Sequence, residues 1–152
     1  GQFVAPLHIH FCSCTPTMLD VACYCTQSRR IARALTDTYD QALAPSGLKV
    51  TQFSLLRMVA RLGSPTISAL ADATGLDRST LGRNLKVLQK DGWAALSAGD
   101  DERTRVVSLT KAGSFAVQRA IPLWDGAQAE IRAKLPTALL RALASAPALL
   151  AS

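Results

Sequence analysis

The sequence predicts a mainly α-helical fold with a small β-wing (α+β), in which a winged helix-turn-helix lobe is joined to a lobe of helices. In residues 66–92, Ala71, Gly75 and Leu81 have the spacing of a helix-turn-helix. The small Ala71 lets two helices cross closely, Gly75 can adopt the left-handed turn conformation, and Leu81 anchors the second helix. Directly afterwards, apolar and polar residues alternate on both sides of residues 99–102, which predicts a β-hairpin.

Three helices are predicted before the turn of the helix-turn-helix at Gly75. The first covers residues 19–43, where apolar residues recur at helical spacing until Ala-Pro-Ser-Gly ends the run. Thr51 is expected to cap a second helix that runs to residue 62, and Thr66 a short third helix that ends at Gly75. The residues expected to face inward on the second helix are Phe53, Leu56, Val59 and Ala60.

Three further helices follow, two of which begin at predicted caps, Asp77 and Thr110. In the fourth helix Leu81, Leu85 and Leu88 form the buried stripe. The fifth helix is expected to bend at Pro122, because proline removes a helical hydrogen bond. Its expected apolar face is Phe115, Val117, Ala120, Ile121, Trp124, Ala127 and Ile131, and a last short helix contains Leu135, Leu139, Leu140, Leu143, Leu149 and Leu150.

The same residues carry a family resemblance. The stretch LDRSTLGRNLKVLQKDG, followed by Asp101-Glu102-Arg103 and by Leu109-Thr110-Lys111-Ala112-Gly113, resembles the MarR family of winged helix-turn-helix transcriptional regulators. The resemblance extends over about residues 19–150. It implies a single domain, 1–152, with an N-terminal arm, a DNA-binding lobe and a helical dimerisation lobe. The arm would be 1–17, the winged helix-turn-helix lobe 48–109, and the dimerisation helices 18–45 and 110–152.

Composition and charge fit this interpretation. The chain has 152 residues, enough for one core, and its net charge of +6 favours a polyanionic partner such as double-stranded DNA. No run of 18 apolar residues occurs, so no membrane span is expected. All four cysteines lie within residues 12–25, which argues against a secreted disulfide framework and favours the cytoplasm. The leucine-rich last helix favours a homodimer, because one small domain cannot cover all of its apolar sides.

The expected DNA contacts are Arg78, Ser79, Thr80, Arg83, Asn84, Lys86, Arg103 and Arg105. On the fourth helix these side chains lie away from the leucine stripe or beside it. Ser79 and Thr80 can bond a phosphate together with free N–H groups at the helix start. Arg83 and Asn84 are expected at base edges, and Arg83 is long enough to reach a guanine with two hydrogen bonds. The alternative is a solvated charged face.

The wing is expected to contribute at its tip. There Arg103 could enter a narrow minor groove, and Arg105 could add a backbone contact. The resemblance implies that Asp101 braces the wing by pairing with an arginine of the recognition helix, Arg83. Base reading and bracing are competing roles for Arg83, and both stay open.

Two kinds of effector are compatible with the sequence. A small molecule would occupy a cleft lined by Phe53, Arg57, Phe115 and Trp124, although aromatic residues at helical spacing also form cores. In the hydroperoxide-sensing branch of the family, Cys25 matches the position of the reactive cysteine and Tyr39 that of a tyrosine. Arg29 stands where another tyrosine is expected, and a free cysteine is often a small core residue.

The predicted function is therefore a dimeric, sequence-specific transcriptional repressor that binds a pseudo-palindromic operator and responds to a small molecule. The alternatives are a redox sensor that acts through Cys25 and an architectural DNA-binding protein with little sequence preference. An enzyme is not expected, since no catalytic set or cofactor motif occurs. No metal site is expected either. In an extended arm His8 and Cys14 would lie roughly 20 Å apart, so one ion could not bind His8, His10, Cys12 and Cys14 together.

Overall fold

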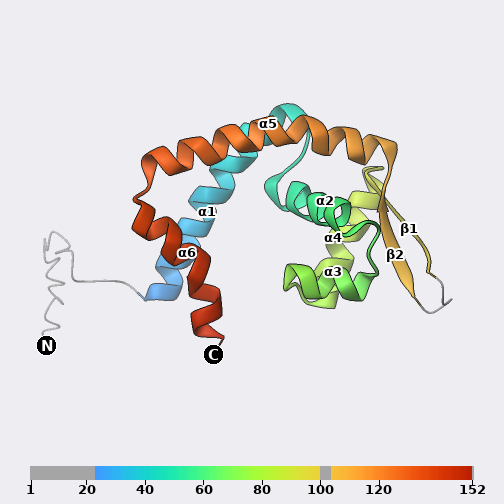
Figure 1. The fold of residues 1–152 in the computed structure, drawn as a ribbon, viewed down its shortest axis with the longest axis horizontal. Helices are drawn as coiled ribbons and strands as arrows, with labels where there is room; N and C mark the ends of the chain where they lie inside the picture. Colours follow the sequence, from blue (N-terminus) through green and yellow to red (C-terminus); the bar gives the residue numbers. More distant parts are fainter. Residues whose placement is uncertain (1–22, 100–103, 152) are drawn as a thin grey trace, which may run out of the picture. The chain divides into compact units, whose positions relative to one another are not determined.

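The computed structural model describes residues 23–99 and 104–151. Figure 1 shows the elements along the chain. By its internal contacts the chain divides into two units, Gly1–Arg33 and Ala34–Ser152, and the division lies within the first helix. The elements are α1 (Tyr24–Leu43), the 3₁₀ turn η1 (Ala44–Ser46), α2 (Val50–Leu62), α3 (Ile67–Thr74), α4 (Arg78–Lys90), β1 (Ala94–Ala98), β2 (Arg105–Leu109), α5 (Lys111–Lys134) and α6 (Thr137–Leu150).

The predicted hairpin and six helices are present, and the wing is a two-stranded antiparallel sheet. The first helix, predicted over residues 19–43, begins at Tyr24, and residues 19–22 lie outside the described residues. The register of the wing pairs Ala94 with Leu109 and Ala98 with Arg105. The wing is also attached to the loop before α3, because the Val107 N–H donates to the Pro65 carbonyl at 2.9 Å. This attachment fixes the base of the wing beside the start of α3.

Three predicted helix caps are present. The side chains of Thr66, Asp77 and Thr110 accept hydrogen bonds from backbone N–H groups at the starts of α3, α4 and α5. Gly75 ends α3 with φ +66°, in the left-handed region that glycine adopts without strain. The predicted caps at Thr66, Asp77 and Thr110 and the predicted glycine turn at Gly75 are therefore confirmed.

The predicted Thr51 cap of α2 is wrong. The helix begins at Val50, one residue earlier, and Thr51 lies inside it. The carboxylate of Asp40, on α1, accepts the Val50 N–H at 2.7 Å, and Gln52 Oε1 accepts the Lys49 N–H at 2.9 Å. A side chain ten residues earlier in the chain thus caps α2, which local sequence cannot indicate.

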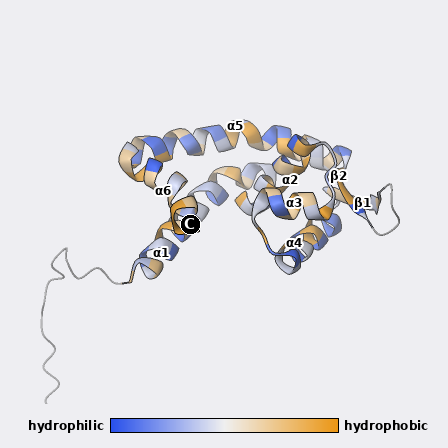
Figure 2. Ribbon diagram, turned by 60° about the horizontal axis from the view of Figure 1, so that its bottom comes forward, coloured by the Kyte–Doolittle hydropathy of each residue, from blue (hydrophilic) through white to orange (hydrophobic). Residues whose placement is uncertain are grey.

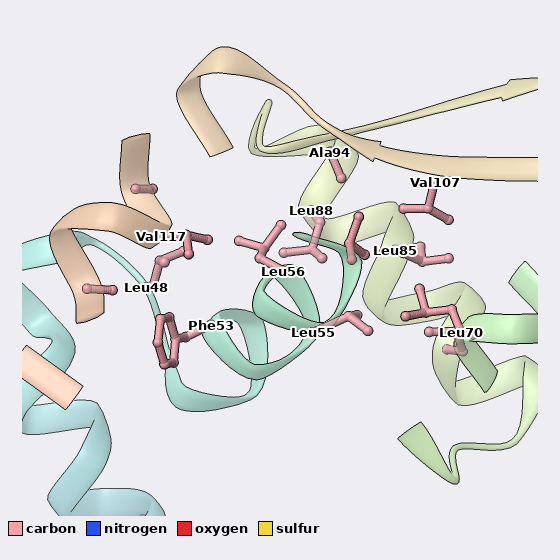
Figure 3. Packing of buried hydrophobic residues seen from close by; sticks show 14 of the residues in the cluster. Leu48, Phe53, Leu55, Leu56, Leu70, Leu85, Leu88, Ala94, Val107 and Val117 are labelled. Carbon is pink, nitrogen blue, oxygen red and sulfur yellow. The ribbon is translucent and has the colours of Figure 1, made fainter. Parts of the chain in front are cut away.

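The core lies where α2 meets α3, α4, β2 and α5. Figure 3 shows Leu56 of α2 next to Leu88 of α4, with Leu48 and Phe53 gathered beside Val117 of α5. Because neighbours pack on several sides of α2, its buried positions are not confined to one stripe. Leu55 is buried as well, whereas Ala60, expected inward, is exposed.

The predicted apolar face of α5 is partly wrong. Ala120, Ala127 and Ile131 are buried, but Phe115 is 62% exposed and Ile121 is 42% exposed. The buried stripe contains Gly113, Ala116, Val117, Ala120, Ala127 and Ile131. Phe115 and Ile121 lie off this stripe, so they cannot pack on α2. The helix continues through Pro122 as one element, and the bend expected there stays a prediction.

The last helix, α6, has no buried residue in the single chain. Leu149 and Leu150 are 72% and 88% exposed, and Figure 2 shows mostly hydrophobic residues along this helix. Leu135 does not belong to α6, because it forms the C-cap of α5. Among the described residues, no helix is long and apolar enough to span a membrane.

Candidate nucleic-acid interface

The helix α4 has two distinct faces. Leu81, Leu85 and Leu88 are at most 1% exposed and fix one face on the core. The opposite face exposes Arg83 and Lys86 to solvent. Because residues three and four apart share a helix face, burial of the leucines determines that these cations point outward. This is the arrangement that a helix needs to enter the major groove of DNA.

The start of α4 is held by a short hydrogen-bond network around Asp77. The hydroxyls of Ser79 and Thr80 each donate to the Asp77 carboxylate at 2.6 Å. These bonds, that from Ser79 first, hold the pKa of the Asp77 carboxyl well below its usual range. Both hydroxyl protons are therefore engaged in the free chain. Ser79 and Thr80 must turn away from Asp77 before their hydroxyls can donate to a phosphate.

Arg83 is oriented along the same network. Its guanidinium donates to the Thr80 hydroxyl oxygen at 3.3 Å, while the side chain stays exposed. This contact points the guanidinium toward the N-terminal end of α4. In helix-turn-helix proteins that end of the recognition helix contacts the base edges.

A second cationic group lies where the wing meets α3 and α4. Arg78 and Arg105 line one hollow of about 510 Å³ together with Ser68, and the Arg78 guanidinium lies 3.5 Å from the Ser68 hydroxyl. Two guanidinium groups and a hydroxyl are suited to a phosphate oxygen. Sequence reasoning missed Ser68, although its place in the first turn of α3 was a usable signal.

Asn84 does not share the face of Arg83. It is half-buried and lines two hollows that it shares with Thr51 and Leu55 of α2. Adjacent helical residues point about 100° apart, since a turn takes 3.6 residues, so Asn84 lies toward α2 when Arg83 faces solvent. A base contact by Asn84 stays a prediction that this orientation does not favour.

Several predicted groups lie outside the described residues. Asp101 and Arg103 belong to the wing tip, so the pairing of Asp101 with Arg83 and the minor-groove contact stay predictions. The arm, residues 1–17 with His8, His10, Cys12 and Cys14, is outside them too. Within residues 23–99 and 104–151, no cluster of histidine, cysteine or carboxylate side chains could bind a metal ion.

Three of the four predicted effector residues come together between α2 and α5. The Arg57 guanidinium lies 4.5 Å from the centre of the Trp124 ring, and Phe53 packs 6.1 Å from the same ring, centre to centre. With Arg61 and Met58 they line a hollow of about 300 Å³. Sequence reasoning missed Arg61, although it follows Arg57 by four residues and shares its helix face.

The fourth predicted effector residue is elsewhere. Phe115 does not line this hollow, and its exposed ring instead lies 5.9 Å from the Arg119 guanidinium. Arg119 also donates to the Pro45 carbonyl at 2.8 Å, which ties α5 to η1. The assignment of Phe115 to a ligand cleft stays a prediction that its position outside this hollow does not favour.

The two described cysteines, Cys23 and Cys25, are free and exposed in the single chain. Cys25 is thus not the small core residue that the alternative interpretation required. Backbone N–H groups of Thr26 and Cys25 bond the Cys23 thiol and lower its pKa. Tyr39, in the last turns of α1, is half-buried, and this burial raises its pKa although the charge of Arg132 opposes the effect.

Comparisons with known proteins agree with this geometry. A model of the MarR family matches residues 46–104. The structure of the Mycobacterium tuberculosis transcriptional regulator MosR in complex with DNA is 43% identical, with a TM-score of 0.74, and the match covers 82% of this chain and 92% of MosR.

Two further matches are more distant. The uncharacterized HTH-type transcriptional regulator YwoH of Bacillus subtilis is 29% identical over 85 residues, 56% of this chain and 62% of YwoH. The chain therefore spans less than two thirds of YwoH. Bordetella bronchiseptica BpsR, whose DNA binding is regulated by 6-hydroxynicotinic acid, is 21% identical with a TM-score of 0.69, over 84% of this chain and 97% of BpsR.

Proposed function

Because the chain belongs to the MarR family of winged-helix transcriptional regulators, we propose that it is a dimeric, sequence-specific repressor whose operator affinity is set by a small molecule. The observation that carries this proposal is α4, whose leucines are buried while Arg83 and Lys86 are exposed to solvent. In this proposal α4 enters the major groove and Arg83 reads a base. Arg78 and Arg105 hold phosphates at the base of the wing.

The dimer is supported by α6, which leaves Leu143, Leu149 and Leu150 exposed in a single chain. Two recognition helices related by a two-fold axis would meet half-sites about one DNA turn apart, as in other dimeric helix-turn-helix proteins. A molecule that changes the spacing of these helices would change operator affinity. Such a molecule need only bind the dimer more tightly at one spacing of the recognition helices than at another.

The effector site that we propose is the hollow beside Trp124. Two arginines, Arg57 and Arg61, line it, and the Trp124 ring provides an aromatic wall. Guanidinium groups bind carboxylates with charge-assisted hydrogen bonds. 6-Hydroxynicotinic acid, which regulates BpsR, carries an aromatic ring and a carboxylate. These two groups would fit the Trp124 wall and the two arginines, which supports an acidic effector here.

The DNA interface is tested by Arg83→Ala. Loss of a bidentate contact to guanine should weaken operator binding by roughly 1 to 3 kcal/mol and relax discrimination at one base pair in each half-site. Fluorescence anisotropy with operator duplexes carrying single base changes measures both effects. Lys134→Ala removes the same charge from an exposed position on α5 and is the control. If the two variants bind all duplexes equally well, α4 does not read bases.

A redox sensor is the second candidate, since both described cysteines are accessible. The lowered thiol pKa belongs to Cys23, so we expect Cys25→Ser to respond to cumene hydroperoxide as the wild type does. Operator binding with and without the peroxide, for both proteins, provides the measurement. Peroxide-dependent release that only the wild type shows would assign sensing to Cys25 and contradict the small-molecule proposal.

A further inference from the structure

A second hollow adjoins the hollow beside Trp124 along α2. This second hollow, of about 390 Å³, lies between α2, the end of α3 and α4, and it shares Ser54 and Met58 with the first. These two residues are four apart on α2, so they form one ridge that separates the hollows. Met58 is flexible and Ser54 is small, which makes this ridge easy to cross.

The two hollows differ in chemistry. The first contains the guanidinium groups of Arg57 and Arg61. None of the described residues that line the second is charged, and Leu55, Ala73 and Leu76 make most of its wall apolar. One half is thus suited to a carboxylate and the other to an apolar body, and each has the size of a small-ligand site.

We infer that the effector is an elongated apolar carboxylic acid that occupies both hollows, its carboxylate at Arg57 and Arg61 and its apolar end against Ala73 and Leu76. This inference rests on the proposed effector site and adds the class of ligand. A compact acid fills only the cationic half. An elongated acid also buries apolar surface in the second half, which is the larger source of affinity.

The second hollow also gives the ligand a direct route to the DNA-reading helix. Leu76 belongs to the turn between α3 and α4, and Asn84 belongs to α4 itself. The Thr74 hydroxyl is engaged, since it donates to the Leu70 carbonyl at 2.7 Å, and the Asn84 amide is the polar group that α4 places in this hollow. An apolar group placed here lies between α2 and α4, and the orientation of α4 on its support depends on that packing.

Three probes test the inference on the full chain by isothermal titration calorimetry: benzoate, biphenyl-4-carboxylate and biphenyl-4-ol. The long acid should bind at least about tenfold more tightly than benzoate, because its second ring buries additional apolar surface. Ala73→Leu fills the apolar half and should remove most of this advantage. Ala69→Leu is the control: it adds the same bulk to the same helix outside the hollow, and the long acid should keep its advantage. Arg57→Gln should weaken both acids and leave the neutral alcohol unchanged.

The position of the ligand is measured by NMR. Biphenyl-4-carboxylate should shift the Asn84 side-chain amide signals, and benzoate should leave them in place. Equal affinities for the short and long acids would overturn the inference, and this result is expected if a second copy of the chain already covers the apolar half. Equal binding of the neutral alcohol and the long acid would overturn it as well.

Measuring the release of operator DNA by each acid distinguishes failure of the two-part ligand from failure of the proposed effector function. If both acids release operator equally well, the effector site stands and the two-part ligand is wrong. If the long acid binds as expected, with the Ala73→Leu loss, and operator affinity does not change, the site stands as a binding site and the effector function is wrong.

Discussion

Gly113→Ala should lower the free energy of unfolding by about 3 kcal/mol, because overpacking against backbone is among the costliest single changes. A Cβ atom at this position would overlap the Trp93 carbonyl oxygen. The same oxygen accepts the Thr110 N–H at 3.1 Å, so it cannot move without breaking the junction between the wing and α5. Denaturant unfolding followed by far-UV circular dichroism measures the change.

The matched control is Gly126→Ala, on the same helix. Apart from the neighbouring residues and backbone of α5 itself, no atom of the described residues lies within 4 Å of a Cβ at Gly126. Alanine should therefore be tolerated and should stabilise the helix by about 0.5 to 1 kcal/mol. Equal stabilities for the two variants would show that the close packing of Gly113 on Trp93 is wrong.

Deleting residues 135–152 should remove operator binding altogether. The deletion takes away α6, whose exposed leucines are the surface that we assign to the second subunit. A monomer presents one recognition helix and loses the second half-site, so operator affinity should fall to the level of binding to unrelated DNA. Light scattering gives the oligomeric state, and anisotropy gives the affinity.

A full-length variant covers the case in which the truncated chain does not fold. Leu149 is 72% exposed in the single chain, so Leu149→Asp should leave the fold intact and disrupt only the dimer. A folded monomer of Leu149→Asp without operator affinity is the expected result. An intact chain that is monomeric at micromolar concentration and still binds operator tightly would contradict the dimer.

The parts of the fold that depend on neighbouring residues could be predicted from the sequence. Thr66, Asp77 and Thr110 cap the helices that they precede, because a cap needs only its own side chain and the next three residues. The leucine stripe of α4 was predictable for the same reason. Once the stripe is fixed, the outward face that carries Arg83 follows from the period of the helix.

The parts that were missed depend on residues distant in sequence. The start of α2 is set by Asp40 of α1, and the cationic hollow joins Arg78 and Ser68 to Arg105 of the wing. Phe115 looked like a core residue because phenylalanine is usually buried, but the stripe that packs on α2 excludes it. Such outcomes are decided by which helices meet, and one sequence does not specify that.

Selection from random DNA duplexes shows whether the chain reads DNA sequence as a dimer. The purified full chain is mixed with a random 30-base-pair library at physiological salt, and the retained duplexes are sequenced over several rounds. We expect enrichment of an inverted repeat whose half-site centres lie about 10 base pairs, one DNA turn, apart. Retention of duplexes without any enriched motif would mean that binding follows charge alone, and it would contradict sequence-specific regulation by this protein.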